Sequence, residues 1–456
     1  MNKRIYTGLF ICTFLIFLLY GCGSSDKADH YKEQTVSENN AALVSDNEVQ
    51  VSGTIYTGVA GFEKNGSKRV FIVCDGKEKT FNVTDTNSGK VVYSDRILYR
   101  NTGTADENMI GICDLSSINT DGTYKIETDS GIESDEFEIK EGLYKDILDG
   151  LTAGGKDIPD KLSANTIRES FLRITDLLLA FELFYDPLTE EGTDTVPKQI
   201  SEARAYTEIL KNYINKHGVL TATLNADMGT CYQYAAVMAM FAYEYDQYDK
   251  EYAKECTKLS ELAYKHTQEQ YDGSSAEDKR TAEDKRYWAA AQLYKLTGKK
   301  EYRQTVEDYQ DNPPEGFRED MSGYLGTVAY LTCYNKIDLD IGEKLITALM
   351  DDINSAVKTA SADDELISVS TGRDDHVDRV FETARLMVLG NYITKNIKYV
   401  ETCENHIAWL YGRNLSGTDH AYGMDSEYHN EPQEFILSGL IDSYIYGSED
   451  ESLSPQ

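Results

Sequence analysis

The segment "NTIRESFLRITDLLLAFELF", residues 165–184, decides the fold class of most of the chain. Its large apolar residues recur every three to four positions. They form one stripe: Ile167, Phe171, Ile174, Leu178 and Phe181. This period is typical of a helix that buries one face. Residues 165–184 are therefore predicted to form a helix packed against a core.

The same helical period continues to residue 447, without strand patterns. Similar helices are predicted at 198–216, 230–246, 249–270, 281–297, 318–335, 341–358, 376–395, 398–411 and 432–446. About a dozen helices with short connections favour helix pairs arranged as a toroid or a solenoid. No fixed-period sequence repeat is visible, and this favours the closed toroid.

Residues 48–141 alternate with a period of two instead. Segments such as "RVFIVCDG" (69–76) and "KTFNVTD" (79–85) are short alternating runs separated by Gly, Asn and Asp. Roughly seven such runs are typical of an antiparallel sandwich. The chain is thus predicted to be multidomain, with an all-β immunoglobulin-like sandwich at 48–141, an all-α domain at 142–447 and a tail at 448–456.

The N-terminus predicts export. Lys3 and Arg4 precede "GLFICTFLIFLLYGC" (8–22), which is short for a membrane span but suits the core of a signal peptide. Its end resembles a bacterial lipobox, which implies cleavage before Cys22 and a lipid on the Cys22 sulfur. Residues 1–22 are therefore predicted to be a lipoprotein signal peptide, with a plain membrane anchor as the alternative.

The segment that follows supports this location. Residues 23–47 are polar, with almost no aromatic residues, and are predicted to be a flexible tether. The mature protein is expected outside the cytoplasm, anchored by lipid to the bacterial cell membrane.

The charge excludes one class of partner. Acidic residues outnumber basic ones by 78 to 45, which gives a formal net charge of −33. Such a chain repels the phosphate backbone, so nucleic acid is excluded. Partners should be neutral or cationic, and the simpler interpretation of the charge is a solvated acidic surface.

The cysteines do not form a disulfide framework. Cys74 and Cys113 both fall in strand-like segments and could pair, whereas Cys12 lies in the signal peptide. The other four are scattered through helical patterns without metal-ligand spacing and are expected to be free thiols: Cys231, Cys256, Cys333 and Cys403. No metal site and no cofactor is predicted.

Several segments, taken in order, resemble glycoside hydrolase family 9, the inverting enzymes of endoglucanase type. They include "LLLAFELF" (177–184), "YQYAAVMAMFAYEYDQYDKEYAKEC" (232–256), "DKRYWAAAQLYKLTGKKEY" (284–302) and "HIAWLYGRNLSGTDHAYG" (406–423). One branch of that family carries an immunoglobulin-like domain before its barrel. The resemblance implies an (α/α)6 barrel at 142–447 and a β-linked polysaccharide or oligosaccharide as substrate. Calcium is common in the family, but no ligand spacing for it is readable here.

The resemblance also implies a catalytic base. "GGKDIPD" (154–160) stands where the family has an Asp-Ala-Gly-Asp loop, so Asp160 would be the base and Asp157 its partner. This chain departs from the family at Pro159, where proline fixes φ in place of a glycine. The alternative is that Asp160 or Ser163 only caps the following helix.

The acid is expected near the C-terminus. "MDSEYHNEPQEF" (424–435) stands where the family has its Asn-Glu motif, which makes Glu431 or Glu427 the candidate. An inverting pair needs its carboxyl groups roughly 6.5–9.5 Å apart, with a water between them. Pro432 predicts a helix start, whose dipole would lower the pKa of Glu431. The alternative is that Glu431 only caps this helix.

Substrate contacts are implied at two further loops, by Arg373, Asp374, His376, His420 and Tyr422. The alternative for the loop at 370–379 is that it only caps the next helix. The family's His-His-Arg contact is absent, and the two tryptophans of the chain stand at positions typical of the scaffold. The predicted function is inverting hydrolysis of a β-linked glucan or related plant polysaccharide. The alternatives are a non-catalytic glycan-binding lipoprotein and a scaffold partner in a surface assembly.

Overall fold

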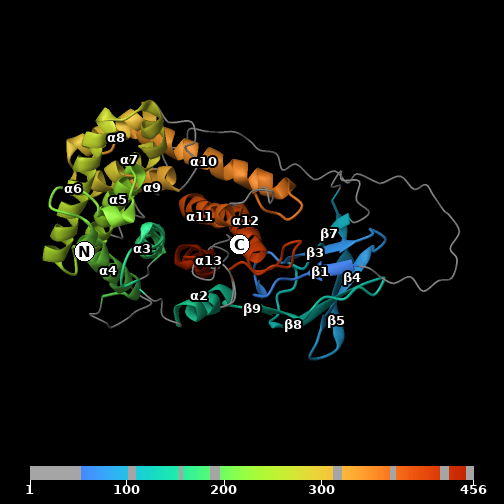
Figure 1. The fold of residues 1–456 in the computed structure, drawn as a ribbon. Helices are drawn as coiled ribbons and strands as arrows, with labels where there is room; N and C mark the ends of the chain where they lie inside the picture. The colour runs from blue at the N-terminus through green and yellow to red at the C-terminus, as the bar shows by residue number, and fades with distance from the viewer. Residues whose placement is uncertain are drawn as a thin grey trace, which may run out of the picture.

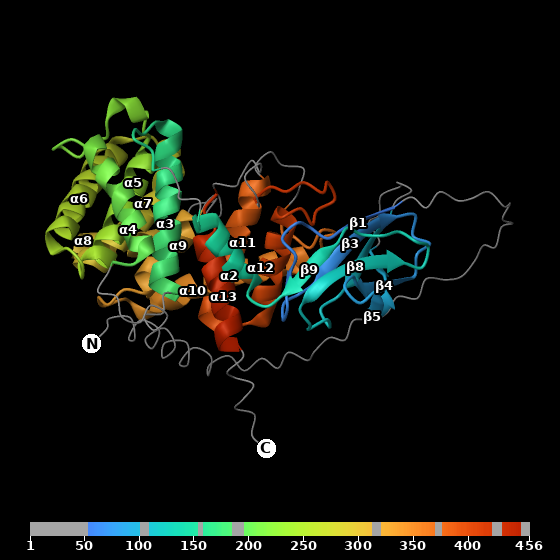
Figure 2. The same cartoon turned by 90° about the horizontal axis from the view of Figure 1, so that it is seen from below.

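The computed structural model describes residues 53–100, 109–153, 158–184, 196–311, 321–369, 376–421 and 431–447. The predicted signal peptide, tether and C-terminal tail lie outside these ranges. Figures 1 and 2 show the strands at one end of the molecule, α4 to α8 at the other, and α11, α12 and α13 between them. Within the described residues, no helix combines the length and the apolar composition that crossing a membrane requires.

The N-terminal domain is a sandwich of two sheets. One sheet has the order β1-β3-β7-β6 and the other β2-β9-β8-β4-β5, with all neighbours antiparallel except β2 and β9. The strands are β1 Gly53–Tyr56, β2 Phe62–Glu63, β3 Arg69–Cys74, β4 Thr80–Asp85, β5 Lys90–Arg96, β6 Leu98–Tyr99, β7 Met109–Asp114, β8 Gly122–Thr128 and β9 Phe137–Lys140. Alternate residues such as Phe81, Val83 and Ile126 fill the space between the sheets. The predicted all-β sandwich is confirmed.

Cys74 and Cys113 do not form a disulfide. Both lie on paired strands, but Cys74 stands opposite Met109 and Cys113 opposite Val70. Both thiols are free and buried. The suggestion that they could pair is therefore wrong, because the register of β3 and β7 separates them by four positions along the ladder.

The C-terminal domain is helical throughout the described residues. Its twelve α-helices are α2 Leu143–Ala153, α3 Ala164–Phe184, α4 Lys198–Leu210, α5 Met228–Tyr245, α6 Lys250–Gly273, α7 Ala276–Thr297, α8 Lys300–Asp311, α9 Ser322–Leu331, α10 Leu339–Ala362, α11 His376–Thr394, α12 Ile397–Leu410 and α13 Glu434–Gly447. The predicted helix at 165–184 is α3, and the whole apolar stripe that begins at Ile167 is buried.

The odd-numbered helices form an inner ring and the even-numbered ones surround it. α3 packs on α5, α5 on α7, α7 on α9, α11 on α13, and α13 on α3, while α10 packs on both α9 and α11. The last helix of the chain therefore closes against the first long one. This arrangement is the predicted (α/α)6 barrel rather than an open array.

The inner helices run in the same direction. Tyr287 in the middle of α7 bonds to Thr327 in the middle of α9, and further along both helices Lys295 bonds to Thr332. On α11 and α13, Asn391 bonds to Ser443, downstream of the contact between Arg385 and the residues that precede α13. The segments that lead into the inner helices therefore share one end of the barrel, here called the N-terminal face.

A buried ion pair ties together the opposite end of the ring. Lys295 on α7 is 3% exposed, and its ammonium group pairs with Glu182 of α3. The same group donates to Thr332 at the end of α9 (2.8 Å) and lies 4.8 Å from the centre of the Tyr243 ring on α5. One lysine of α7 thus contacts three other helices of the ring, α3, α5 and α9.

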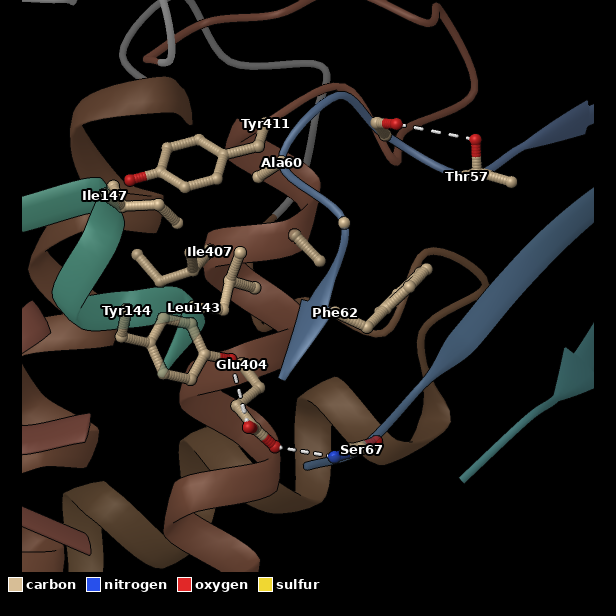
Figure 3. A pocket seen from close by; sticks show the side chains of 13 residues that line it. Thr57, Ala60, Phe62, Ser67, Leu143, Tyr144, Ile147, Glu404, Ile407 and Tyr411 are labelled. Carbon is tan, nitrogen blue, oxygen red and sulfur yellow. Dashed lines mark hydrogen bonds between the residues drawn. The ribbon is translucent and has the colours of Figure 1, made fainter. Parts of the chain in front are cut away.

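The two domains share a buried polar contact at Glu404 of α12. Its carboxylate accepts hydrogen bonds from the Ser67 backbone N–H (2.9 Å), from the Tyr144 hydroxyl on α2 (3.0 Å) and from the Tyr444 hydroxyl on α13. Figure 3 shows Glu404 between Tyr144 and Ser67. The adjoining cavity measures only about 20 Å³, room for about one water and too small for a sugar.

Glu404 should make stability depend on pH. Burial raises the pKa of Glu404 from 4.5 to about 7, although Tyr444, Ser67 and Tyr144 donate to its carboxylate. The folded state therefore holds this proton more tightly than the unfolded chain. The resulting stabilisation is complete below the unfolded value of 4.5 and is lost as the pH rises through about 7. The loss should amount to about 3 kcal/mol.

Denaturant unfolding of wild type and Glu404→Gln at pH 5 and pH 8 checks this expectation. From pH 5 to pH 8, the free energy of unfolding of the variant should rise by about 2–3 kcal/mol relative to that of wild type, because glutamine does not titrate. A difference between the two proteins that does not change with pH would show that Glu404 titrates normally.

Candidate active site

Asp160 lies at the mouth of the N-terminal face. It is exposed and precedes α3 by four positions, next to Leu162, whose backbone N–H donates to the Tyr213 hydroxyl (2.8 Å). Ser163, not Asp160, caps the helix, because its hydroxyl oxygen accepts from the Thr166 N–H. Asp160 therefore has no capping task in the described structure. Its predicted partner Asp157 lies outside the described residues.

Glu431 lies further inside the ring, in contact with Arg385 of α11. The Arg385 guanidinium donates to Glu431 Oε1 (2.9 Å) and to the Pro432 carbonyl (2.7 Å). It also lies 3.7 Å from Asp176 of α3, and the other oxygen of Asp176 accepts from the Phe435 N–H of α13. Asp176, not Glu431, thus accepts the hydrogen bond at the start of α13. Glu431 belongs to an ionic network with Arg385 of α11 and Asp176 of α3.

This environment changes the expected chemistry of Glu431. Burial raises the pKa of Glu431, while the nearby charge of Arg385 acts to lower it. The lowering expected from the helix terminus is therefore outweighed by desolvation. A raised pKa suits a general acid, whereas the contact with Arg385 favours the charged form.

The two candidate carboxylates are placed at different depths. Asp176, the α3 partner of Arg385, lies about 18 Å along the helix from Ala164, at 1.5 Å per residue. Asp160 precedes Ala164 and stays at the mouth. The described residues place Asp160 before α3 and Glu431 before α13, two neighbouring inner helices, without joining the two carboxylates in a contact. Because Glu427 also lies outside the described residues, the catalytic pair stays a prediction.

His376 and His420 are brought together around a tryptophan. The His420 ring stacks on Trp409 with centroids 5.0 Å apart, and His376 meets both rings edge-on, at 5.7 Å from Trp409 and 6.2 Å from His420. Trp409 is 3% exposed, so it supports His420 and does not itself form an open sugar platform. The other predicted contacts, Arg373, Asp374 and Tyr422, lie outside the described residues.

Glu365 fixes this aromatic cluster and was not predicted. One of its carboxylate oxygens accepts from both the Trp409 indole N–H and the Leu415 backbone N–H, each at 2.9 Å. Its sequence context, "ADDEL", looks like any acidic turn. Glu365 and Trp409 are 44 positions apart in the sequence, and only the fold brings them into contact.

A polar cavity opens on the same face, at the starts of α5 and α7. It encloses about 530 Å³. Its lining comes from three consecutive inner helices and the residue before α5: Arg168, Asp227, Met228, Gly229, Thr230, Gln233, Asp278, Thr281, Ala282 and Lys285. None of these residues is aromatic. Within the described ranges, no cluster of three or more His, Cys, Asp or Glu side chains could hold a metal ion.

Comparison with protein families decides the relationship. Residues 214–448, more than half of the chain, match the family described as glycosyl hydrolase family 9, and residues 50–132 match the cellulase N-terminal ig-like domain. The chain belongs to glycosyl hydrolase family 9. A comparison with curated protein sequences gave no significant match.

Solved structures of family 9 share the fold at low sequence identity. A metagenome-derived family 9 endoglucanase has a TM-score of 0.69 at 16% identity, covering 82% of this chain and 86% of its own. A Bacteroides ovatus family 9 protein has a TM-score of 0.68 at 14% identity, covering 86% and 99%. AaCel9A in complex with cellobiose-like isofagomine has a TM-score of 0.63 at 15% identity, covering 84% and 87%. This chain and these family 9 structures thus share the fold although few of their residues are identical.

Removing the Glu365 carboxylate should loosen the aromatic cluster of this family 9 protein. Glu365→Ala leaves the buried Trp409 indole N–H without its acceptor, so we expect a loss of about 1–3 kcal/mol in the free energy of unfolding. Chemical denaturation followed by tryptophan fluorescence measures it. The neighbouring Asp364→Ala is the matched control and should change stability by less than about 0.5 kcal/mol. Equal effects of the two substitutions would mean that the indole contact contributes nothing specific.

Proposed function

We propose that this family 9 protein hydrolyses a β-linked glucan or a related plant polysaccharide with inversion, at the N-terminal face of its barrel. The observation that supports this most is the packing of α13 against α3. It brings the start of α13, which follows Glu431, against α3, the helix that follows Asp160. An early base and a late acid can serve one cleft only if the ring closes in this way.

In this proposal the roles follow from the environments of the carboxyl groups. Asp160, exposed at the mouth, activates the attacking water with the assistance of Asp157. Glu431 protonates the leaving oxygen if burial keeps its proton, and Glu427 does so if Arg385 keeps Glu431 charged. His420, backed by Trp409, contacts the sugar together with His376 and residues of the two flanking loops.

The relatives support a glucan as substrate. One similar structure is that of an endoglucanase, and another was solved with cellobiose-like isofagomine. This activity and this ligand belong to those two proteins. Together with membership of the family, they favour β-linked glucose units over other sugars for this chain.

A reducing-end assay on mixed-linkage glucan, xyloglucan and cello-oligosaccharides tests the activity. We expect release by wild type and a loss of at least about 100-fold in Asp160→Asn, because general base catalysis contributes 10²–10⁴-fold. Glu427→Gln and Glu431→Gln separate the two acids, and Asp149→Asn, at an exposed pair with Lys145, is the control. Freshly released products should carry the inverted α configuration by NMR. Release unchanged in Asp160→Asn would remove Asp160 from its role.

A second function is favoured by one observation. Arg385 lies 2.9 Å from Glu431 and favours its charged form, which cannot donate a proton. A family 9 barrel without an acid would capture glycans without cutting them. Retention of labelled glycan without any release of reducing ends would identify this binding function.

We also propose that the mature protein is held at the outer face of the bacterial membrane by a lipid on Cys22. The apolar run and lipobox-like residues at 8–22 and the polar segment at 23–47 support this. In a bacterial host, wild type should appear in the membrane fraction and incorporate labelled fatty acid, whereas Cys22→Ala should not incorporate it. Fatty acid incorporation by the variant would place the modification elsewhere.

A further inference from the structure

A buried glutamine directly before α13 bonds to a loop from another part of the chain. Gln433 is 2% exposed and follows Glu431 by two positions. The Tyr411 hydroxyl donates to its Oε1, and its Nε2 donates to the Ala421 carbonyl (3.2 Å). Both partners are buried as well. The two bonds therefore restrain the loop strongly, because a buried polar group that loses its partner is costly.

The chemistry of the three groups fixes the orientation of the amide. The Ala421 carbonyl can only accept, so the NH2 group of Gln433 must face it. This leaves Oε1 of Gln433 to accept from the Tyr411 hydroxyl. An apolar side chain of similar length would leave both partners without this bond.

Both partners belong to the loop that carries His420. Tyr411 directly follows α12, and the chain then turns back, so that the His420 N–H donates to the carbonyl of the last residue of α12 (2.8 Å). Ala421 is the next residue. Gln433 thus bonds to the first and the last residue of the segment 411–421, here called the His420 loop.

The neighbours of Gln433 at the start of α13 bond to other helices. These bonds come from α11, α3 and α4 and hold the start of α13 in the ring: Pro432 with Arg385 (2.7 Å), Phe435 with Asp176 (3.2 Å) and Glu434 with Gln199 (3.1 Å). Gln433 connects this held segment to the His420 loop. Its amide therefore restrains the position of His420 relative to Glu431.

We propose that Gln433 is a positioning residue, whose amide holds the His420 loop in place against the segment that carries Glu431. The proposal rests on the proposed function for the roles of these two residues, because His420 is the sugar contact there and Glu431 the acid candidate. A sugar contact and a proton donor must act on the same glycan, and a misplacement of about 1 Å can cost about 10²-fold in rate. Gln433 acts through the two residues and does not touch the glycan.

The fluorescence of Trp409 tests the restraint without any turnover. Replacing Trp288, the only other tryptophan of the chain, by phenylalanine leaves Trp409 as the single reporter. His420 stacks on Trp409, with ring centroids 5.0 Å apart. In Gln433→Met the His420 loop should move away from the indole, and the acrylamide quenching constant should rise at least about threefold. Circular dichroism establishes beforehand that the variant is folded.

Steady-state hydrolysis of mixed-linkage glucan tests the consequence for the reaction. Gln433→Met should lower kcat at least about tenfold and raise KM at least about threefold, because the acid candidate and the sugar contact are both displaced. A merely structural role would remove folded protein, which lowers kcat at an unchanged KM.

Tyr411→Phe is a milder variant, which keeps the ring and removes only the hydroxyl. It should shift the quenching constant and kcat in the same directions, with kcat at least about threefold below wild type, and it carries the test if Gln433→Met does not fold. Because Tyr411 and Gln433 act as one unit, the double variant should be no slower than Gln433→Met alone.

Gln199→Met is the matched control. This glutamine also bonds to the start of α13, at Glu434, but it lies on α4 and makes no bond to the described His420 loop. It should leave the quenching constant and KM within about 1.5-fold of wild type.

Three results would overturn the proposal: an unchanged quenching constant and KM in folded Gln433→Met, changes of equal size in Gln433→Met and Gln199→Met, or a further loss of kcat in the double variant. If wild type does not hydrolyse glucan, the proposed function fails. The quenching constants then still decide whether Gln433 restrains the His420 loop.

Discussion

Replacing Lys295 by methionine is expected to lower the free energy of unfolding by about 3–5 kcal/mol. The substitution leaves the Glu182 carboxylate, 9% exposed at its side chain, without its cation inside the ring. It also removes a hydrogen bond to Thr332 and the contact with the Tyr243 ring, so α3, α5 and α9 all lose a partner. Urea or guanidinium unfolding followed by circular dichroism gives the change.

The double variant Lys295→Met/Glu182→Met separates charge from packing. If the stranded carboxylate causes the loss, the second substitution should recover most of it, because apolar groups of similar size can replace a buried ion pair at little cost. A double variant as unstable as the single one would instead assign the loss to the geometry of the lysine. Lys299→Met, on an exposed pair with Glu261, is the control and should cost less than about 1 kcal/mol.

Replacing Arg385 by methionine should have a comparable effect at the start of α13. Arg385 is buried and lies between Glu431 and Asp176, so its loss leaves two carboxylates facing each other inside the barrel. We expect about 3–5 kcal/mol of destabilisation at pH 7. Without the cation, the pKa of Glu431, which burial already raises, should rise further in the folded state. The destabilisation should therefore shrink as the pH falls and Glu431 takes up a proton.

Denaturation of wild type and Arg385→Met at pH 5 and pH 7.5 measures both parts of this prediction. Arg379→Met lies on the same helix, where its side chain forms a partly exposed pair with Glu382, and it should cost less than about 1 kcal/mol at either pH. A loss in Arg385→Met that is equally large at both pH values would mean that packing, not charge, holds α13 in place.

The fold could be predicted from the sequence because the buried face of a helix or strand requires apolar residues at regular spacing. The stripe from Ile167 to Phe181 predicts the buried face of α3, and alternation around Phe81 and Val83 predicts the sandwich. α8 was missed because its buried stripe in "KEYRQTVEDYQD" has one aliphatic residue, Val306, between Tyr302 and Tyr309, and the rest of the helix is polar. A short stripe made largely of tyrosine leaves a weak signal.

The site was predicted less well, because partners distant in sequence leave no local pattern. Asp160 was placed before the correct helix, but only the structure shows that Ser163 takes the cap. The helix start at Pro432 predicted a lowered pKa for Glu431. Its burial among α3, α11 and α13 raises the pKa instead, and no spacing within "HNEPQEF" reveals that burial. Arg385, Asp176 and Glu365 were not candidates for the same reason.

The bond between Asp176 and Phe435 joins residues 259 positions apart. During synthesis, α3 emerges long before its neighbour α13 exists, and until then the barrel is incomplete and the apolar side of α3 that α13 covers is exposed. Completion depends on the last helix, so chains that end before Glu434 should be degraded or aggregate rather than persist as smaller folded proteins. Only polypeptides that include the C-terminal helix α13 should therefore reach a stable folded state.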